Sequence, residues 1–125
     1  MSLYLGLRTT IYMVPDLGQA KQWYATLFET QPYFDEPFYV GFNIRGYELG
    51  LLPEEEPVER GENVLTYWGV DDIQRVYIHM IRNGATPRKP PSNVGGEIEV
   101  ATVKDPWGNV IGLIYNPHFA RDEFR

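Results

Sequence analysis

The first half of the chain alternates between the two spacings of apolar residues that distinguish strands from helices. Residues 9–14 are β-branched and apolar, which predicts a strand. Apolar residues then recur every three or four positions over 17–28, which predicts a helix with Asp16 as its N-cap. Residues 38–44 and 47–52 are again strand-like and are separated by a two-residue turn. The order of elements is therefore strand, helix and further strands.

The second half repeats this order. Residues 65–70 are strand-like, and apolar residues at helical spacing follow over 73–81. Residues 97–103 and 110–115 form a second pair of predicted strands around the turn 105–109. The chain therefore reads as an internal repeat of two half-modules. Each has about sixty residues, too few for either to be expected to bury a complete core alone.

Two segments between the predicted elements differ from the rest in composition. Residues 54–62 carry an acidic run typical of an exposed linker. We therefore expect a single domain made of half-modules 1–53 and 63–118, followed by a tail over 119–125. Residues 87–96 contain three prolines and end in paired glycines, which is typical of an ordinary long turn or of a mobile flap over a site.

Composition and charge narrow the possible partners and chemistry. The chain has 125 residues, 43% of them hydrophobic, and a net charge of −6, which disfavours nucleic acid and anionic membranes as partners. Because there is no cysteine, disulfides, thiolate metal sites and a cysteine nucleophile are excluded. The first ten residues lack the features of a secretory signal and no apolar run could span a bilayer, so we expect a soluble cytoplasmic protein.

Few side chains outside the predicted strands are candidates for chemistry. His79 shares a helix face with two arginines, and we expect it to be solvated. His118 follows the last strand, where a role at the rim of a site or in a dimer contact is the less favoured interpretation. Asp35-Glu36 is interpreted as a turn, and Trp107 as an exposed anchor for a neighbouring subunit. No Ser–His–Asp arrangement or glycine-rich phosphate loop is present in the sequence.

Three groups of residues, in this order, resemble the vicinal oxygen chelate superfamily, which contains glyoxalase I, extradiol dioxygenases and bleomycin-resistance proteins. The groups are Val14-Pro15-Asp16-Leu17 with Trp23-Tyr24, Val70-Asp71-Asp72-Ile73 with Gly84-Ala85, and Asp105-Pro106-Trp107-Gly108-Asn109-Val110-Ile111. The resemblance implies an α+β fold in which two tandem βαβββ modules form a curved mixed sheet, a cup, with helices on the outside. It also implies a homodimer.

The same resemblance implies four positions for metal ligands. In this sequence they are Thr9, Gly50, Leu65 and Gly112, none of which has a carboxylate or an imidazole. We therefore expect a metal-less branch of the superfamily with no cofactor.

If these positions face the cup, strand alternation places their i±2 neighbours there as well. The residues expected to bind a ligand are Thr9, Ile11, Met13, Glu48, Gly50, Leu52, Leu65, Tyr67, Gly112 and Ile114. Residues of opposite parity, such as Tyr12 and Trp68, should pack beneath the helices. The two glycines either make room for a ligand or allow a close approach of strands.

Glu48 is the best candidate for a catalytic residue. In an apolar cup its carboxylate could have a raised pKa and act as a base, or stay charged and receive a cationic group. A glutamate that points at water from the edge of the sheet is the third possibility.

Three functions are compatible with these features. The favoured one is a metal-independent protein that binds an aromatic or cationic small molecule in an apolar cup. The alternatives are a lyase, isomerase or dioxygenase-like enzyme of the same superfamily with an atypical site, and a structural or regulatory dimer whose cup is vestigial.

Overall fold

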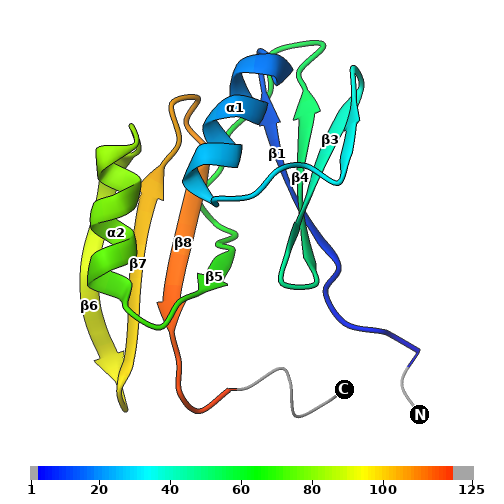
Figure 1. Cartoon of the computed structure of the whole chain (residues 1–125). Coiled ribbons are helices and arrows are strands. Elements are labelled where there is room, and N and C mark those ends of the chain that lie inside the picture. Colours follow the sequence, from blue (N-terminus) through cyan, green and yellow to red (C-terminus); the bar gives the residue numbers. More distant parts are fainter. Residues whose placement is uncertain (1–2, 120–125) are drawn as a thin grey trace. The chain divides into compact units, whose positions relative to one another are not determined.

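The computed structural model describes residues 3–119, which divide between Glu59 and Arg60 into two units (Figure 1). The first unit contains β1 (Thr9–Val14), α1 (Leu17–Leu27), β2 (Phe34–Glu36), β3 (Tyr39–Ile44) and β4 (Tyr47–Pro53). The second contains β5 (Tyr67–Gly69), α2 (Ile73–Arg82), β6 (Thr86–Gly95), β7 (Ile98–Lys104) and β8 (Val110–Tyr115). The boundary between the units lies within residues 54–62, and residues 120–125 of the expected tail lie outside the described residues.

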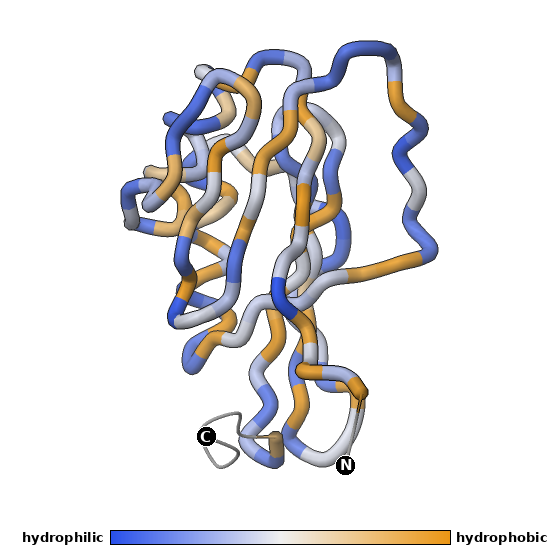
Figure 2. The backbone as a smooth tube through the Cα atoms, turned by 90° about the vertical axis from the view of Figure 1, so that its right-hand side faces the viewer, coloured by the Kyte–Doolittle hydropathy of each residue, from blue (hydrophilic) through white to orange (hydrophobic). Residues whose placement is uncertain are grey.

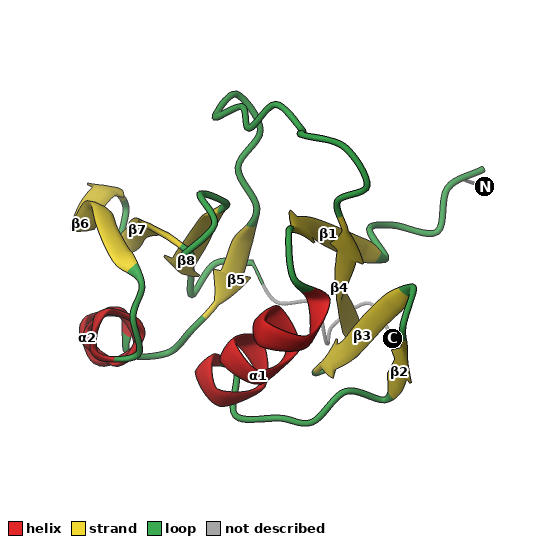
Figure 3. Cartoon of the chain, turned by 90° about the horizontal axis from the view of Figure 1, so that it is seen from above, coloured by secondary structure: helices red, strands yellow, loops and turns green. Residues whose placement is uncertain are grey.

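Both units have the same topology. Each holds a four-stranded sheet, with strand orders β1-β4-β3-β2 and β5-β8-β7-β6. The first strand of each unit is parallel to the last, and the other pairs are antiparallel. The helix of each unit lies along one side of its own sheet (Figure 3). The α+β fold with two βαβββ modules, predicted from the repeat and the resemblance, is confirmed.

Both helices begin at an aspartate, and each aspartate satisfies a backbone N–H of the first turn. Asp16 accepts a hydrogen bond from the amide nitrogen of Gln19 at 3.0 Å, and Asp72 accepts one from that of Arg75 at 3.2 Å. The predicted N-cap at Asp16 is therefore confirmed. After α2, Gly84 has a φ of 101°, a left-handed conformation that glycine adopts without steric cost.

The core of each unit lies between its helix and one face of its sheet. Hydrophobic and hydrophilic residues are interspersed along the backbone (Figure 2). Tyr12 is buried and stacks on Tyr24 of α1, with ring centroids 5.6 Å apart. In the second unit Ile111 and Leu113 are buried, and Trp68, the register partner of Leu113, is half-buried. We call the face of each sheet opposite its helix the open face.

The largest difference from the sequence-based expectations is residues 86–95, which form the strand β6 and not a turn or a flap. Its prolines are tolerated because β6 is an edge strand, where a missing N–H leaves no ladder bond unmade. Three register shifts interrupt its pairing with β7. Asp35 and Glu36 belong to the short edge strand β2, so the turn expected there is also wrong.

The strand expected from residue 65 begins at Tyr67. Leu65 precedes the strand. The carbonyl of Thr66, the next residue, accepts a hydrogen bond from the amide of Gly112 on β8 at 3.0 Å. Within residues 3–119, neither helix has the length and apolar character needed to cross a bilayer.

Candidate functional site

The open face of the first sheet brings together the residues that strand parity placed there. In the parallel pair β1–β4, Thr9 is the register partner of Glu48, Ile11 of Gly50 and Met13 of Leu52. Register partners point to the same side of a sheet, and their neighbours of opposite parity are the buried core residues. The side chain of Ile11 is 46% exposed, so this face is accessible within the unit.

Glu48 lies at the centre of a cluster of hydroxyl groups on this face. Its Oε1 accepts a hydrogen bond from Thr9 Oγ1 at 2.6 Å, and its Oε2 accepts one from the Tyr33 hydroxyl at 2.5 Å. The Tyr39 hydroxyl is a third donor to the same carboxylate. Hydrogen bonds from neutral donors to an ionised carboxylate are stronger than neutral pairs. We call Thr9, Tyr33, Tyr39 and Glu48 the Glu48 cluster.

The cluster holds Glu48 in its ionised form. Burial raises the pKa of the Glu48 carboxyl, but the hydrogen bonds from Thr9, Tyr33 and Tyr39 outweigh it, so the pKa lies below its ordinary value. The tyrosines respond in the opposite direction. Burial, and then the negative charge of Glu48, raise the pKa of Tyr39 to about 12, and the hydrogen bond to Glu48 raises that of Tyr33. Of the possibilities for Glu48, this favours a charged group over a base with a raised pKa.

Two glycines make the cluster possible. A Cβ at Gly50 would lie 2.7 Å from Cζ of Tyr39 and closer still to its hydroxyl, so the phenol ring lies directly on the backbone of Gly50. A Cβ at Gly41, the partner of Gly50 on β3, would lie 2.6 Å from Oε2 of Glu48 and 3.0 Å from Cε1 of Tyr33. The space above Gly50 therefore holds the side chain of Tyr39, where the sequence had suggested room for a ligand.

In the second unit the predicted residues Tyr67, Gly112 and Ile114 share the open face, and Leu65 lies outside the strand. A Cβ at Gly112 would lie 2.5 Å from the carbonyl oxygen of Thr66 and 2.7 Å from Cδ1 of Tyr67. Gly112 thus serves a close approach of β5 to β8, the second of the two roles considered for the glycines.

Sequence reasoning did not identify Tyr33 and Tyr39. The position of Tyr39 could have been found, because the turn after β3 pairs Asn43 with Glu48 and Gly41 with Gly50, and Tyr39 is the next residue of that parity. No periodicity identifies Tyr33, which precedes β2 and is positioned by a backbone hydrogen bond to Gly41 at 2.9 Å.

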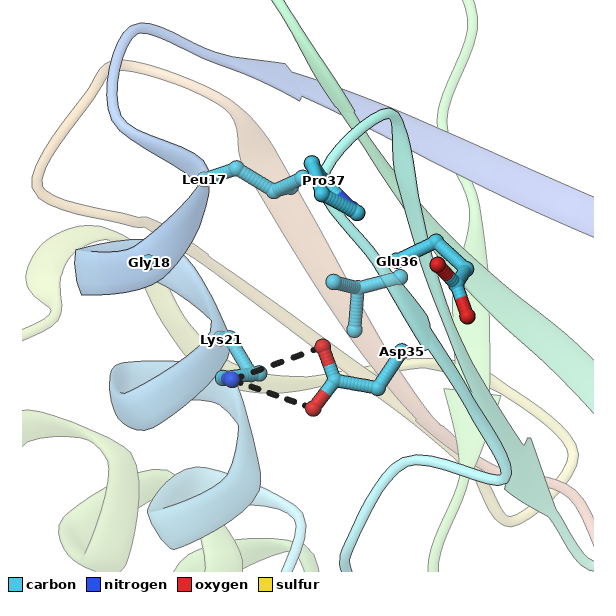
Figure 4. Close-up of a pocket in the computed structure, with 7 residues that line it drawn as sticks. Leu17, Gly18, Lys21, Asp35, Glu36 and Pro37 are labelled. Atoms are coloured by element: carbon cyan, nitrogen blue, oxygen red, sulfur yellow. Dashed lines mark hydrogen bonds and ion pairs between the residues drawn. The ribbon is translucent and has the colours of Figure 1, made fainter.

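A cavity of about 270 Å³ lies beside the carboxylate. It is lined by Arg8, Thr9, Tyr33, Asn43, Gly46, Tyr47 and Glu48. A second cavity, of about 420 Å³, lies between α1 and the β2–β3 hairpin and is lined by Leu17, Gly18, Lys21, Asp35, Glu36, Pro37 and Val40. Figure 4 shows Lys21 and Asp35 pointing toward each other across it, with a nitrogen–oxygen distance of 3.0 Å. No residue of the Glu48 cluster lines this second cavity, whereas Thr9, Tyr33 and Glu48 line the first.

The residues present do not fit a divalent metal at the positions implied by the resemblance. Thr9 donates its hydroxyl hydrogen to Glu48, and Gly50, Leu65 and Gly112 offer no ligating side chain. No group of three or more His, Cys, Asp or Glu side chains within residues 3–119 could hold a metal ion. The one carboxylate of the cluster already accepts hydroxyl hydrogens at both of its oxygens.

The paired βαβββ modules define the structural class of this protein, and comparison with known families names it. The model of the Glyoxalase/Bleomycin resistance protein/Dioxygenase superfamily matches residues 6–113. The chain belongs to this superfamily. No curated protein matches the sequence.

Solved structures with the same fold are distant in sequence. A glyoxalase-related enzyme from Fulvimarina pelagi is 16% identical with a TM-score of 0.75, over 91% of this chain and 90% of its own. A glyoxalase/bleomycin resistance protein from Albidiferax ferrireducens T118 is 18% identical with a TM-score of 0.75, over 89% and 98%. A lactoylglutathione lyase from Agrobacterium tumefaciens is 16% identical with a TM-score of 0.73, over 94% and 100%. These likenesses show the fold alone.

Proposed function

We propose that this chain is a metal-independent small-molecule-binding protein whose ligand carries a cationic group that pairs with Glu48. The observation that carries the proposal is the ionised carboxylate on the open face, held by three hydroxyl donors and flanked by tyrosine rings. A fixed negative charge beside aromatic rings is a favourable environment for an organic ammonium or guanidinium group.

The surroundings of Glu48 supply contacts for the rest of such a ligand. Ile11 and Leu52 present apolar side chains on the same face, and Tyr33 is 64% exposed. Binding sites for small molecules typically combine apolar walls with a few fixed polar groups. Because the Glu48 cluster is hydrogen-bonded before a ligand arrives, little ordering is needed on binding. The features therefore favour a cation attached to an aromatic or apolar body.

An enzyme of the same superfamily is the competing proposal, and its best candidate residue is also Glu48. A general base works best when its pKa lies near the operating pH. The hydrogen bonds to Glu48 move its pKa the other way, which makes it a weak base. The lyase among the similar structures is only 16% identical to this chain and gives no support for a lyase activity here. Binding is the better-supported function.

Thermal unfolding in the presence of matched compounds tests the proposal. Benzyltrimethylammonium and its neutral carbon isostere, neopentylbenzene, differ only in charge. We expect the ammonium compound to raise the melting temperature of the wild type and the isostere to have a much smaller effect. Glu48→Gln should abolish the difference, and Glu55→Gln, which removes an exposed carboxylate from the same unit, should keep it. Equal shifts for wild type and Glu48→Gln would overturn the proposal.

We further propose a homodimer, as the family resemblance implies. Sedimentation equilibrium should give twice the chain mass of 14.5 kDa. A monomer at all concentrations would contradict the dimer and leave the assignment of Glu48 to be judged by the thermal experiment.

A further inference from the structure

The second unit carries a cluster of opposite charge that the proposed function does not use. Arg88 of β6 and Lys104 of β7 both contact Glu62, a residue of the segment that precedes β5. The Arg88 guanidinium approaches Oε1 of Glu62 through two nitrogens, Nε at 2.8 Å and Nη2 at 2.6 Å. Nζ of Lys104 lies 3.3 Å from Oε2. Both oxygens of one carboxylate are thus held by two cations.

A β-bulge aims Arg88 at this cluster. The pairing of β6 with β7 passes from Pro87–Val103 to Lys89–Thr102, so Arg88 is the extra residue at the register shift. Bulges of this kind redirect a side chain relative to the regular alternation of a strand. The redirected guanidinium also donates from Nη1 to the Thr102 hydroxyl at 3.1 Å.

The Thr102 contact fixes the guanidinium independently of Glu62. Thr102 is 3% exposed and lies on the central strand β7, whereas the Glu62 side chain is 47% exposed and belongs to a loop. Removal of Glu62 therefore leaves the guanidinium anchored to Thr102, with Nε, Nη2 and the nearby Lys104 ammonium available to another carboxylate, and it removes no buried side chain. In the structure Nε and Nη2 both contact Oε1 of Glu62, and Lys104 contacts Oε2, so the two side chains together hold both oxygens of a carboxylate. The paired N–H donors of a guanidinium suit a carboxylate better than the single ammonium of a lysine does.

We propose that Arg88, Lys104 and Thr102 form a carboxylate-binding site on the second unit, and that Glu62 is an internal occupant which a ligand carboxylate displaces. The ligand class is an organic acid. The proposal is independent of the cation site at Glu48, because the residues, the unit and the charge are different. The hydrogen bonds from Arg88 and Lys104 lower the pKa of the Glu62 carboxyl, consistent with an occupant bound in its ionised form.

Competition from Glu62 lowers the apparent affinity of the site for a free carboxylate. A tethered group occupies a nearby site at an effective concentration in the millimolar range. A free carboxylate must therefore compete with Glu62 in the wild type, and removal of Glu62 should strengthen its binding.

The test is an NMR titration of the full chain with benzoate, followed through backbone amides of β6 and β7. We expect Glu62→Ala to bind benzoate about tenfold more tightly than the wild type, the gain that corresponds to a site filled by the tethered Glu62 about nine-tenths of the time. Glu59→Ala, which removes an exposed acidic side chain three residues earlier, is the matched control for net charge and should behave as the wild type. Benzamide, the neutral analogue, should gain nothing from Glu62→Ala.

The role of Arg88 is tested in the same background. Glu62→Ala combined with Arg88→Lys keeps the charge and removes the two-nitrogen geometry, so the gain in benzoate affinity should disappear. If Glu62→Ala does not give a folded amide spectrum, Glu62→Gln takes its place, with a smaller gain expected. Benzoate affinity that is equal in the wild type and the Glu62 variant would overturn the proposal, as would an equal gain in Glu59→Ala or a gain that Arg88→Lys leaves intact. Glu62 would then be only a tether for the loop.

Discussion

Replacement of Gly112 by alanine tests whether the glycines of the open faces serve close packing. The added Cβ would lie 2.5 Å from the backbone oxygen of Thr66 and within 3.1 Å of two atoms of the Tyr67 ring. Carbon–oxygen contacts in sheets are ordinarily about 3.3–3.6 Å. The Thr66 carbonyl would therefore have to retreat, although it also accepts the amide hydrogen of Gly112 at 3.0 Å. Because β5 has only three residues, it has few other bonds to β8 that could compensate.

The expected cost follows from two opposing effects. Overpacking of this kind destabilises a protein by about 1–3 kcal/mol. We expect Gly112→Ala to lie at the upper end of this range, because the added Cβ meets a backbone atom, which can move less easily than the end of a side chain. Replacing glycine by alanine also reduces the entropy of the unfolded chain, which stabilises by about 0.4–1 kcal/mol. We expect a net loss of about 2 kcal/mol in the free energy of unfolding.

Urea unfolding of the full chain measures this loss, as a lower midpoint with an unchanged dependence on urea concentration. Gly69→Ala is the matched control, since Gly69 lies on the open face of the adjacent strand β5 and an added Cβ there meets nothing within 4 Å. It should leave the midpoint unchanged or raise it slightly. A Gly112→Ala protein as stable as Gly69→Ala would refute the close-packing interpretation.

Three further predictions concern the carboxylates. Because the folded-state pKa of Glu48 lies below 4.5, its contribution to stability is complete above about that pH and is lost as the pH falls through the folded-state value. The difference in unfolding free energy between wild type and Glu48→Gln should therefore shrink in acid; a pH-independent difference would contradict this. Tyr39→Phe removes one donor and should raise the pKa of Glu48 toward its ordinary value, measured by carboxyl ¹³C NMR; an unchanged pKa would argue against the Tyr39 contact. Asp105 is 3% exposed and accepts hydrogen bonds from the backbone amides of Trp107 and Asn109 and from Nδ2 of Asn109. Asp105→Ala should therefore lower the free energy of unfolding, measured by urea unfolding, by about 2–3 kcal/mol. Asp105→Asn should lose less.

The regular elements and the sheet faces could be predicted because both follow from periodicity. The period of two along residues 9–14 and 47–52 assigned Thr9 and Glu48 to one face, and the parallel register of β1 and β4 makes them partners. The helix start at Asp16 followed from local capping chemistry.

The parts of the fold and of the site that could not be predicted depend on features that leave no periodic pattern in the sequence. Tyr33 reaches Glu48 from outside any strand, so its role rests on the path of a loop. The bulge at Arg88 lies in a proline-rich segment, and prolines are as compatible with an edge strand as with a turn. The lowered pKa of Glu48 depends on three hydroxyl donors, two of them from residues that the pattern did not identify.

The most direct test of the central claim is a calorimetric titration of chelator-treated protein with benzyltrimethylammonium. A metal-independent cation site at Glu48 predicts saturable binding without added metal, unaffected by Glu55→Gln and lost in Glu48→Gln. Binding that Glu48→Gln retains, or that appears only after a divalent metal is added back, would contradict it.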